Sequence, residues 1–205
     1  MDVFLFPLIN VTLFPRTTKP LNIFEPRYLD MVRQSVETQI PIALGFIEDP
    51  TAVTEVVPGQ KVSFVREIAG FGSTQVIEER ANSTMLVFIQ GIGKCRLGEV
   101  KSAEGGVILC EAEPVPEDLH IDPELRPQVH ALNKILARWI SSHIPDTQQR
   151  DLFLANLTGP EEIVGAFSAY LIRDYDLQQM VLEFNSLNEK IRFLHRLAES
   201  SEITV

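Results

Sequence analysis

The sequence predicts an α+β protein in which a β-barrel or β-sandwich lobe is followed by an all-α helical lobe. Many short apolar runs bounded by Pro, Gly or Asn follow closely on one another in the first half, which favours a barrel or sandwich over a parallel sheet. After "EPVPED" (113–118) the apolar spacing changes to that of helices. We therefore expect a β-rich lobe at residues 1–116 and a helical lobe at 117–205, which together form one domain.

The first half contains seven expected strands, all rich in Val, Ile and Phe. They cover residues 3–6, 10–14, 21–24, 42–47, 61–68, 84–91 and 106–113. Several are continuous apolar runs, which indicates burial on both faces. One short helix interrupts them: Pro26 suits the first helical position, and Tyr28, Met31, Val32 and Val36 then recur at helical spacing.

The second half contains five expected helices. The first follows Asp122, and the second covers about residues 147–157. Each of the last three opens on two residues with capping-box spacing. These pairs are Thr158 with Glu161, Asp176 with Gln179, and Ser186 with Glu189.

The charge of the chain disfavours nucleic acid as a partner. Residues 1–116 hold 10 basic and 14 acidic side chains and residues 117–205 hold 8 and 14, so both lobes are acidic. The N-terminus lacks the features of a signal peptide, and no apolar run reaches the roughly 20 residues that span a bilayer. Two cysteines do not make a disulfide framework. We therefore expect a cytoplasmic protein with no membrane partner.

The sequence contains no recognisable catalytic, metal or cofactor motif. The nearest match to a phosphate loop, "FIQGIGKC", has Phe88 in place of the first glycine and Cys95 in place of the hydroxyl residue. The four histidines form no zinc-binding pair, and no serine elbow is present. We expect no enzyme activity, no cofactor and no metal. An enzyme that uses Cys95 or Cys110 is a further hypothesis, which unreactive thiols would exclude.

Phe71 is the one candidate binding residue. It lies between two glycines in "REIAGFGSTQV" (66–76), and glycines permit a tight turn. We predict that Phe71 is exposed at the tip of a hairpin, where a partner could contact it. The alternative is that Phe71 folds back on the strands, or that Gly72 marks a bulge.

The opening of the chain resembles the N-terminal substrate-binding domain of Lon proteases. The family pattern is present as Phe6-Pro7-Leu8, as Val11 to Pro15, and as Pro20 to Tyr28. Arg16 departs from it, because a glycine is common after the second proline. The segments "VFIQGIGKCRL" (87–97) and "LEFNSLNEKIRFLHRL" (182–197) are similar to later parts of the family.

This resemblance implies a PUA-like β-barrel lobe beside the helical lobe, in a stand-alone relative without the ATPase and protease domains of Lon. The implied function is that of a protein- or peptide-binding module for unfolded or specific client proteins, with a separate ATP-dependent protease as a candidate partner. The alternative is a small-molecule or RNA-binding PUA-like protein.

The residues of the opening motif are consistent with a framework role. We predict that its prolines Pro7, Pro15 and Pro20 lie at the ends or edges of strands. We also predict that Arg27 pairs with a nearby carboxylate such as Glu25 and that Tyr28 anchors the helix.

Overall fold

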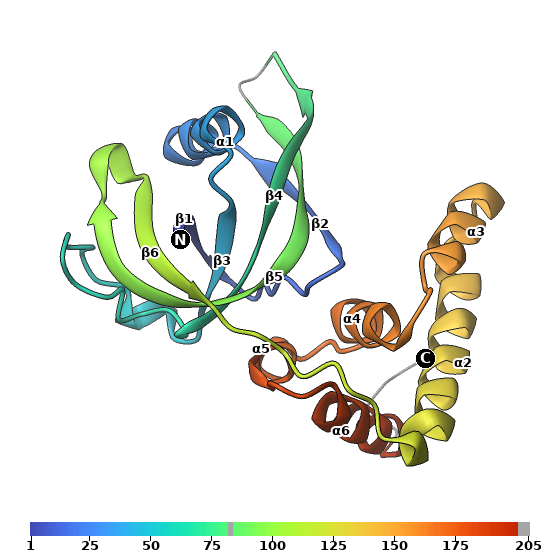
Figure 1. Cartoon of the computed structure of the whole chain (residues 1–205). Coiled ribbons are helices and arrows are strands. Elements are labelled where there is room, and N and C mark those ends of the chain that lie inside the picture. The colour runs from blue at the N-terminus through green and yellow to red at the C-terminus, as the bar shows by residue number, and fades with distance from the viewer. Residues whose placement is uncertain (82–83, 201–205) are drawn as a thin grey trace. The chain divides into compact units, whose positions relative to one another are not determined.

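The computed structural model describes residues 1–81 and 84–200. The chain divides into two compact units, Met1–Val115 and Pro116–Val205 (Figure 1). The first contains a mixed sheet and one α-helix, and the second is helical. The expected α+β class is therefore confirmed.

The described residues of the first unit form six strands. These are β1 (Asp2–Ile9), β2 (Thr18–Ile23), β3 (Ile42–Ile47), β4 (Ile68–Glu79), β5 (Met85–Ser102) and β6 (Ile108–Pro114). Their order is β2-β5-β4-β3-β1-β6, and β6 pairs with β5 as well (Figure 1). Because of this second pairing, β5, β4, β3, β1 and β6 close into a ring, to which β2 is attached as an outer strand.

The length of β5 makes this closure possible. Its first part, Met85–Gln90, pairs with both β2 and β4, and its last part, Cys95–Ser102, pairs with β6. Two register shifts interrupt the β5–β6 ladder, between Leu97 and Val100 and between Val100 and Ser102. Irregularities of this kind bend a strand and increase its twist, which lets one long strand serve two neighbours.

Strand β1 is buried on both faces, as its continuous apolar sequence predicts. Phe4 and Phe6 belong to one hydrophobic cluster, whereas Val3 and Leu5 belong to another. Helix α1 (Pro26–Thr38) packs on the first cluster through its buried side chains Tyr28, Leu29, Met31 and Val32. The helix begins at Pro26, after an extended Glu25, as expected.

Two of the expected strands are absent from the structure. Residues 10–14 form a loop whose side chains Thr12, Leu13 and Phe14 are nevertheless buried. Residues 61–67 contain only an isolated bridge between Lys61 and Glu99. Leu13, Phe14 and Phe64 of these segments are buried, but neither segment has a continuous ladder partner, which a strand needs.

Short 3₁₀ helices connect several of these elements. They are η1 (Pro50–Ala52), η2 (Glu104–Gly106) and η3 (Pro123–Leu125). The second unit then contains α2 (Arg126–His143), α3 (Thr147–Ala155), α4 (Pro160–Tyr170), α5 (Tyr175–Glu183) and α6 (Leu187–Glu199). No helix in the described part of the chain is long and apolar enough to cross a membrane.

The predicted capping boxes are mostly wrong. Helix α4 is capped by Gly159 and α5 by Asp174, whose carboxylate accepts from the backbone N–H groups of Asp176 and Leu177. Ser186 does stand at the N-cap of α6, but its side chain makes no capping hydrogen bond. A capping residue is selected by local backbone geometry, so the spacing of residue types alone misplaces it by one or two positions.

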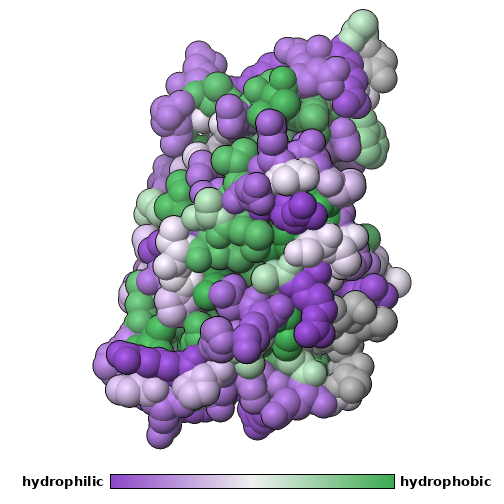
Figure 2. All heavy atoms as spheres, turned by 90° about the vertical axis from the view of Figure 1, so that its right-hand side faces the viewer, coloured by the Kyte–Doolittle hydropathy of each residue, from purple (hydrophilic) through white to green (hydrophobic). Residues whose placement is uncertain are grey.

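Exposed apolar side chains occur in both units. The most exposed among the described residues are Phe24 at 69%, Leu152 at 66% and Ile92 at 59%. On the face drawn in Figure 2, hydrophobic side chains lie among hydrophilic ones. Singly exposed apolar residues are normal on a protein surface and do not by themselves mark a site.

Candidate functional site

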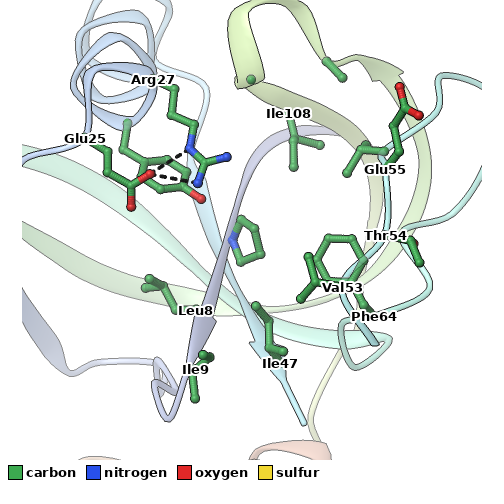
Figure 3. Close-up of a pocket in the computed structure, with 15 residues that line it drawn as sticks. Leu8, Ile9, Glu25, Arg27, Ile47, Val53, Thr54, Glu55, Phe64 and Ile108 are labelled. Atoms are coloured by element: carbon green, nitrogen blue, oxygen red, sulfur yellow. Dashed lines mark hydrogen bonds and ion pairs between the residues drawn. The ribbon is translucent and has the colours of Figure 1, made fainter. Parts of the chain in front are cut away.

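An open cavity of about 570 Å³ lies in the first unit (Figure 3). Its walls come from the end of β1, the start of α1, the end of β3, the segment 53–56, Phe64 and the turn that enters β6. The lining residues are Pro7, Leu8, Ile9, Glu25, Arg27, Tyr28, Ile47, Val53, Thr54, Glu55, Val56, Phe64, Ala103, Gly106 and Ile108. Most of them are apolar.

The cavity opens where β1 and β6 separate. Their ladder runs from Asp2 opposite Glu111 to Leu5 opposite Ile108, and β1 continues to Ile9 without β6. On the other side β1 stays paired with β3 as far as Ile9. Before Ile108 the chain turns away through Gly106, whose φ of 81° is a conformation that favours glycine. The space left beside the end of β1 becomes the cavity.

The helix side of the cavity carries an ion pair next to two aromatic rings that pack against each other at an angle of 37°. The Arg27 guanidinium lies 2.8 Å from a Glu25 carboxylate oxygen and 4.5 Å from the centre of the Tyr28 ring. The Tyr28 ring lies 4.2 Å from that of Phe6. The ion pair agrees with the predicted pairing of Arg27, and the contact between the two rings agrees with the predicted anchoring role of Tyr28. Burial is the main cause that raises the pKa of Tyr28, so its hydroxyl is neutral at physiological pH.

The opposite side of the cavity is formed by the segment 53–56 and by Phe64. In Figure 3 the labelled side chains Val53 and Phe64 lie together on one side, and Glu25 and Arg27 lie on the other. Val53 is 51% exposed and Ile9 is 49% exposed, although both belong to the lining. When a ligand covers half-exposed apolar side chains in a concave surface, the removal of their apolar area from water favours binding.

The site offers binding groups more clearly than reactive ones. Its lining consists of apolar side chains, one hydroxyl from Thr54, the Tyr28 phenol and the charges of Glu25, Arg27 and Glu55. Within residues 1–81 and 84–200, no group of three or more His, Cys, Asp and Glu side chains could hold a metal ion. The arrangement suits an apolar ligand that is oriented by a few polar contacts.

Phe71 lies elsewhere. It stands within β4, opposite Ala43 of β3 and Gly93 of β5, and it is only 8% exposed. The prediction of an exposed aromatic at a hairpin tip is therefore wrong, because "GFG" (70–72) belongs to the middle of the sheet. Its side chain joins the hydrophobic cluster that includes Val3 and Leu5. We do not count Phe71 among the residues of the candidate site.

The two cysteines are also buried in that cluster, with side chains fully covered. Burial raises the pKa of Cys95 to about 12 and that of Cys110 to about 11. Thiols with such pKa values are protonated at physiological pH and are therefore poor nucleophiles.

One half of this site comes from the opening motif of the sequence. Pro7, Leu8, Glu25, Arg27 and Tyr28 belong to the opening motif, which was interpreted as framework. The other half, from the segment 53–56 and Phe64, was missed. A short run of Val and Thr residues gives no local signal, since its role depends on lying beside distant strands.

Comparison with known families agrees with the fold and with the motif at the cavity. Residues 2–200 match the ATP-dependent protease La (LON) substrate-binding domain. The chain belongs to this family. The match spans the elements from β1 to α6.

Two solved structures have the same fold as this LON substrate-binding domain. A Lon N-terminal domain protein from Xanthomonas campestris is 18% identical, with a TM-score of 0.65, over 95% of this chain and 96% of that one. The N-terminal domain of the Mycobacterium avium complex Lon protease is 14% identical, with a TM-score of 0.66, over 97% and 98%. No curated protein sequence shows significant similarity to the chain.

Proposed function

We propose that this LON substrate-binding domain is a non-catalytic recognition module that binds unfolded or specific client proteins in the cavity beside β1. Membership of a substrate-binding family supports the class of function. The observation that carries the proposal is the lining of the cavity, which combines half-exposed apolar side chains with an ion pair at its edge. Unfolded chains expose the apolar side chains that such a surface can cover.

A recognition module of this kind can deliver its clients to another protein. We propose a separate ATP-dependent protease as that partner, and the cytoplasm as the place where the two meet. The buried, unpaired thiols Cys95 and Cys110 are compatible with a reducing compartment. Co-purification of the tagged chain with an ATP-dependent protease tests this part of the proposal, and its absence from the eluate would contradict it.

A small-molecule ligand is the second candidate, because a cavity of about 570 Å³ lies in the size range of small-molecule sites. RNA is less favoured, since both halves of the chain are acidic. Retention of RNA by the purified protein, with a steep dependence on salt, would reverse this order.

Titration with an unfolded protein tests the proposed function. A permanently unfolded, fluorescently labelled client and its folded form are titrated separately with the chain in the absence of ATP, and fluorescence anisotropy reports binding. We expect the unfolded form to bind more tightly by at least about tenfold, which corresponds to roughly 1.4 kcal/mol. Equal binding of both forms, or none, would contradict general recognition of unfolded chains.

A further inference from the structure

The end of β1 has a backbone edge without a partner. The Phe4 N–H donates to the Pro41 carbonyl at 2.9 Å, which directs the peptide groups of Phe4 toward β3. Because successive residues of a strand alternate, Pro7 and Ile9 direct their peptide groups to the opposite side. There β6 pairs with β1 only as far as Leu5. Within the part of the chain that the structure describes, no backbone hydrogen bond reaches Pro7 or Ile9 from that side.

The cavity lies along this unpaired edge. Pro7, Leu8 and Ile9 form one of its walls, and Val53 and Phe64 contribute to another (Figure 3). An added strand would lie about 4.8 Å from β1 and would direct alternate side chains to opposite faces. A chain that entered the cavity in this way would form main-chain hydrogen bonds with β1 and would cover apolar lining residues as well.

The charges of the lining favour a basic group in the ligand. Glu25, Arg27 and Glu55 are the charged residues of the wall, so their sum is −1. Glu25 already faces Arg27 at 2.8 Å. Among the described residues, no hydrogen bond or ion pair engages the Glu55 carboxylate. A lysine or arginine side chain of the ligand would pair with Glu55, whereas an acidic one would be repelled.

We propose that the β1 edge from Pro7 to Ile9 takes an extended apolar segment of a client protein by strand addition, with a basic side chain of that segment next to Glu55. This inference rests on the proposed function and names the class of segment that the site accepts. The edge offers the Pro7 carbonyl as acceptor and the Ile9 N–H as donor, but Pro7 has no N–H of its own. Such an edge forms a short and incomplete ladder, which suits transient binding of many clients and limits pairing with other sheets.

Reversal of the charge at residue 55 and in a peptide tests the proposed pairing of Glu55 with a basic side chain of the ligand. A short labelled peptide of alternating Val and Thr with one Lys, and the same peptide with Glu instead, are titrated by fluorescence anisotropy. We expect Glu55→Lys to weaken binding of the Lys peptide by about five- to tenfold and to strengthen binding of the Glu peptide. Glu37→Lys, an exposed site on α1 outside the lining, is the matched control and should change neither affinity.

Backbone methylation tests the strand geometry. Methyl groups on alternate amide nitrogens of the Lys peptide remove the donors to β1 and leave every side chain in place. We expect them to abolish measurable binding when they lie on the edge that faces β1, and to have little effect on the other edge. Equal affinity of the two methylated peptides and the parent peptide would overturn strand addition.

A substitution in the cavity wall tests whether the peptide and the unfolded client bind at the same site. Val53→Asp places a charge in the apolar lining and should weaken both the peptide and the unfolded client by at least about tenfold. Val36→Asp, at a 40% exposed position on α1 outside the lining, is its control.

Two further outcomes separate the claims. If the unfolded client binds Val53→Asp and Glu55→Lys as well as the wild type, the location proposed here is wrong while the recognition function stands. If the wild type binds no client, the proposed function itself fails. Sedimentation of the wild type as a dimer, with Val53→Asp a monomer, would show a second copy of the chain on this edge and would overturn the client segment as its occupant.

Discussion

Tyr28 shows how one residue of the opening motif serves the framework and the cavity together. Its ring is buried between Phe6 and Arg27 and holds the start of α1 against β1. The same side chain belongs to the lining of the cavity. A substitution here therefore changes stability and ligand binding together, and cannot separate the two roles.

The buried thiols lead to a prediction at the residue scale. The pKa values of Cys95 and Cys110 are raised to about 12 and about 11 from an ordinary value of 9.0. At pH 8 a thiol-specific reagent should leave both unmodified in the native protein and should modify both in denaturant. Rapid reaction of either cysteine in the native state would contradict this and would reopen the hypothesis of a cysteine enzyme.

The same pKa shifts contribute to the dependence of stability on pH. Both folded pKa values lie above the unfolded value, so the contribution of the thiols is complete below about pH 9. Above that pH the unfolded chain loses protons that the folded chain keeps, so each thiol lowers the free energy of unfolding by about 1.4 kcal/mol per pH unit until its folded pKa is reached. Urea midpoints should therefore fall between pH 9 and 11.

At the scale of elements, the loop of residues 10–17 is held on the sheet by its backbone. Arg16 N–H donates to the Gly91 carbonyl at 2.9 Å, and the Gly91 N–H donates to the Thr17 carbonyl at 2.8 Å. Arg16 has a φ of 61°, which accounts for the glycine that the family pattern favours at this position. The loop crosses β4 and β5 at glycines, where a side chain would prevent so close an approach.

Gly70→Ala tests this crossing. A Cβ at Gly70 would overlap the carbonyl oxygen of Leu13, which is a backbone atom and cannot rotate away as the end of a flexible side chain could. We expect the substitution to lower the free energy of unfolding by about 3 kcal/mol or more, as measured by urea denaturation. Gly105→Ala is the comparison: its Cβ meets open space and strains only a φ of 60°, so a loss of about 1 kcal/mol is expected. Equal losses would show that the loop can shift.

The elements that sequence predicted well are those whose local pattern and tertiary role agree. Helix α1 begins at Pro26 as expected, and β3 covers the predicted residues 42–47. Pro7 and Pro20 lie at strand edges that lack a partner. Pro7 lies in β1 beyond the last residue that pairs with β6, and Pro20 lies in the outer strand β2. Residues 10–14 were predicted as a strand because they are apolar and buried, but they have no ladder partner. Phe71 was predicted as exposed, but it pairs with residues of β3 and β5 that are distant in sequence.

At the scale of the whole molecule, each unit has hydrophobic residues enough for a core of its own. The two large clusters of the first unit contain only residues from Met1–Val115. In the second unit the buried side chains come from η3, α2, α4, α5, α6 and the connection between α4 and α5. The predicted division near residue 116 is therefore open to a direct experiment.

Expression of residues 1–116 alone tests this division. We expect the fragment to unfold cooperatively in urea and to bind the same client as the full chain, because the ring of strands, α1 and the cavity lie within it. Circular dichroism and anisotropy measure the two properties. A fragment without a cooperative transition would show that the helical unit is needed for the β-rich unit to fold.

The sequence by itself determined the α+β class, the family and the acidic surface, since these follow from periodicity, a specific motif and composition. It also predicted that Arg27 pairs with a nearby carboxylate such as Glu25 and that Tyr28 anchors the helix. Only the tertiary structure decided that Phe71 is buried, that β1 continues beyond β6, and that the segment 53–56 faces its free edge. These features depend on pairing between distant strands, which local patterns of residues do not encode.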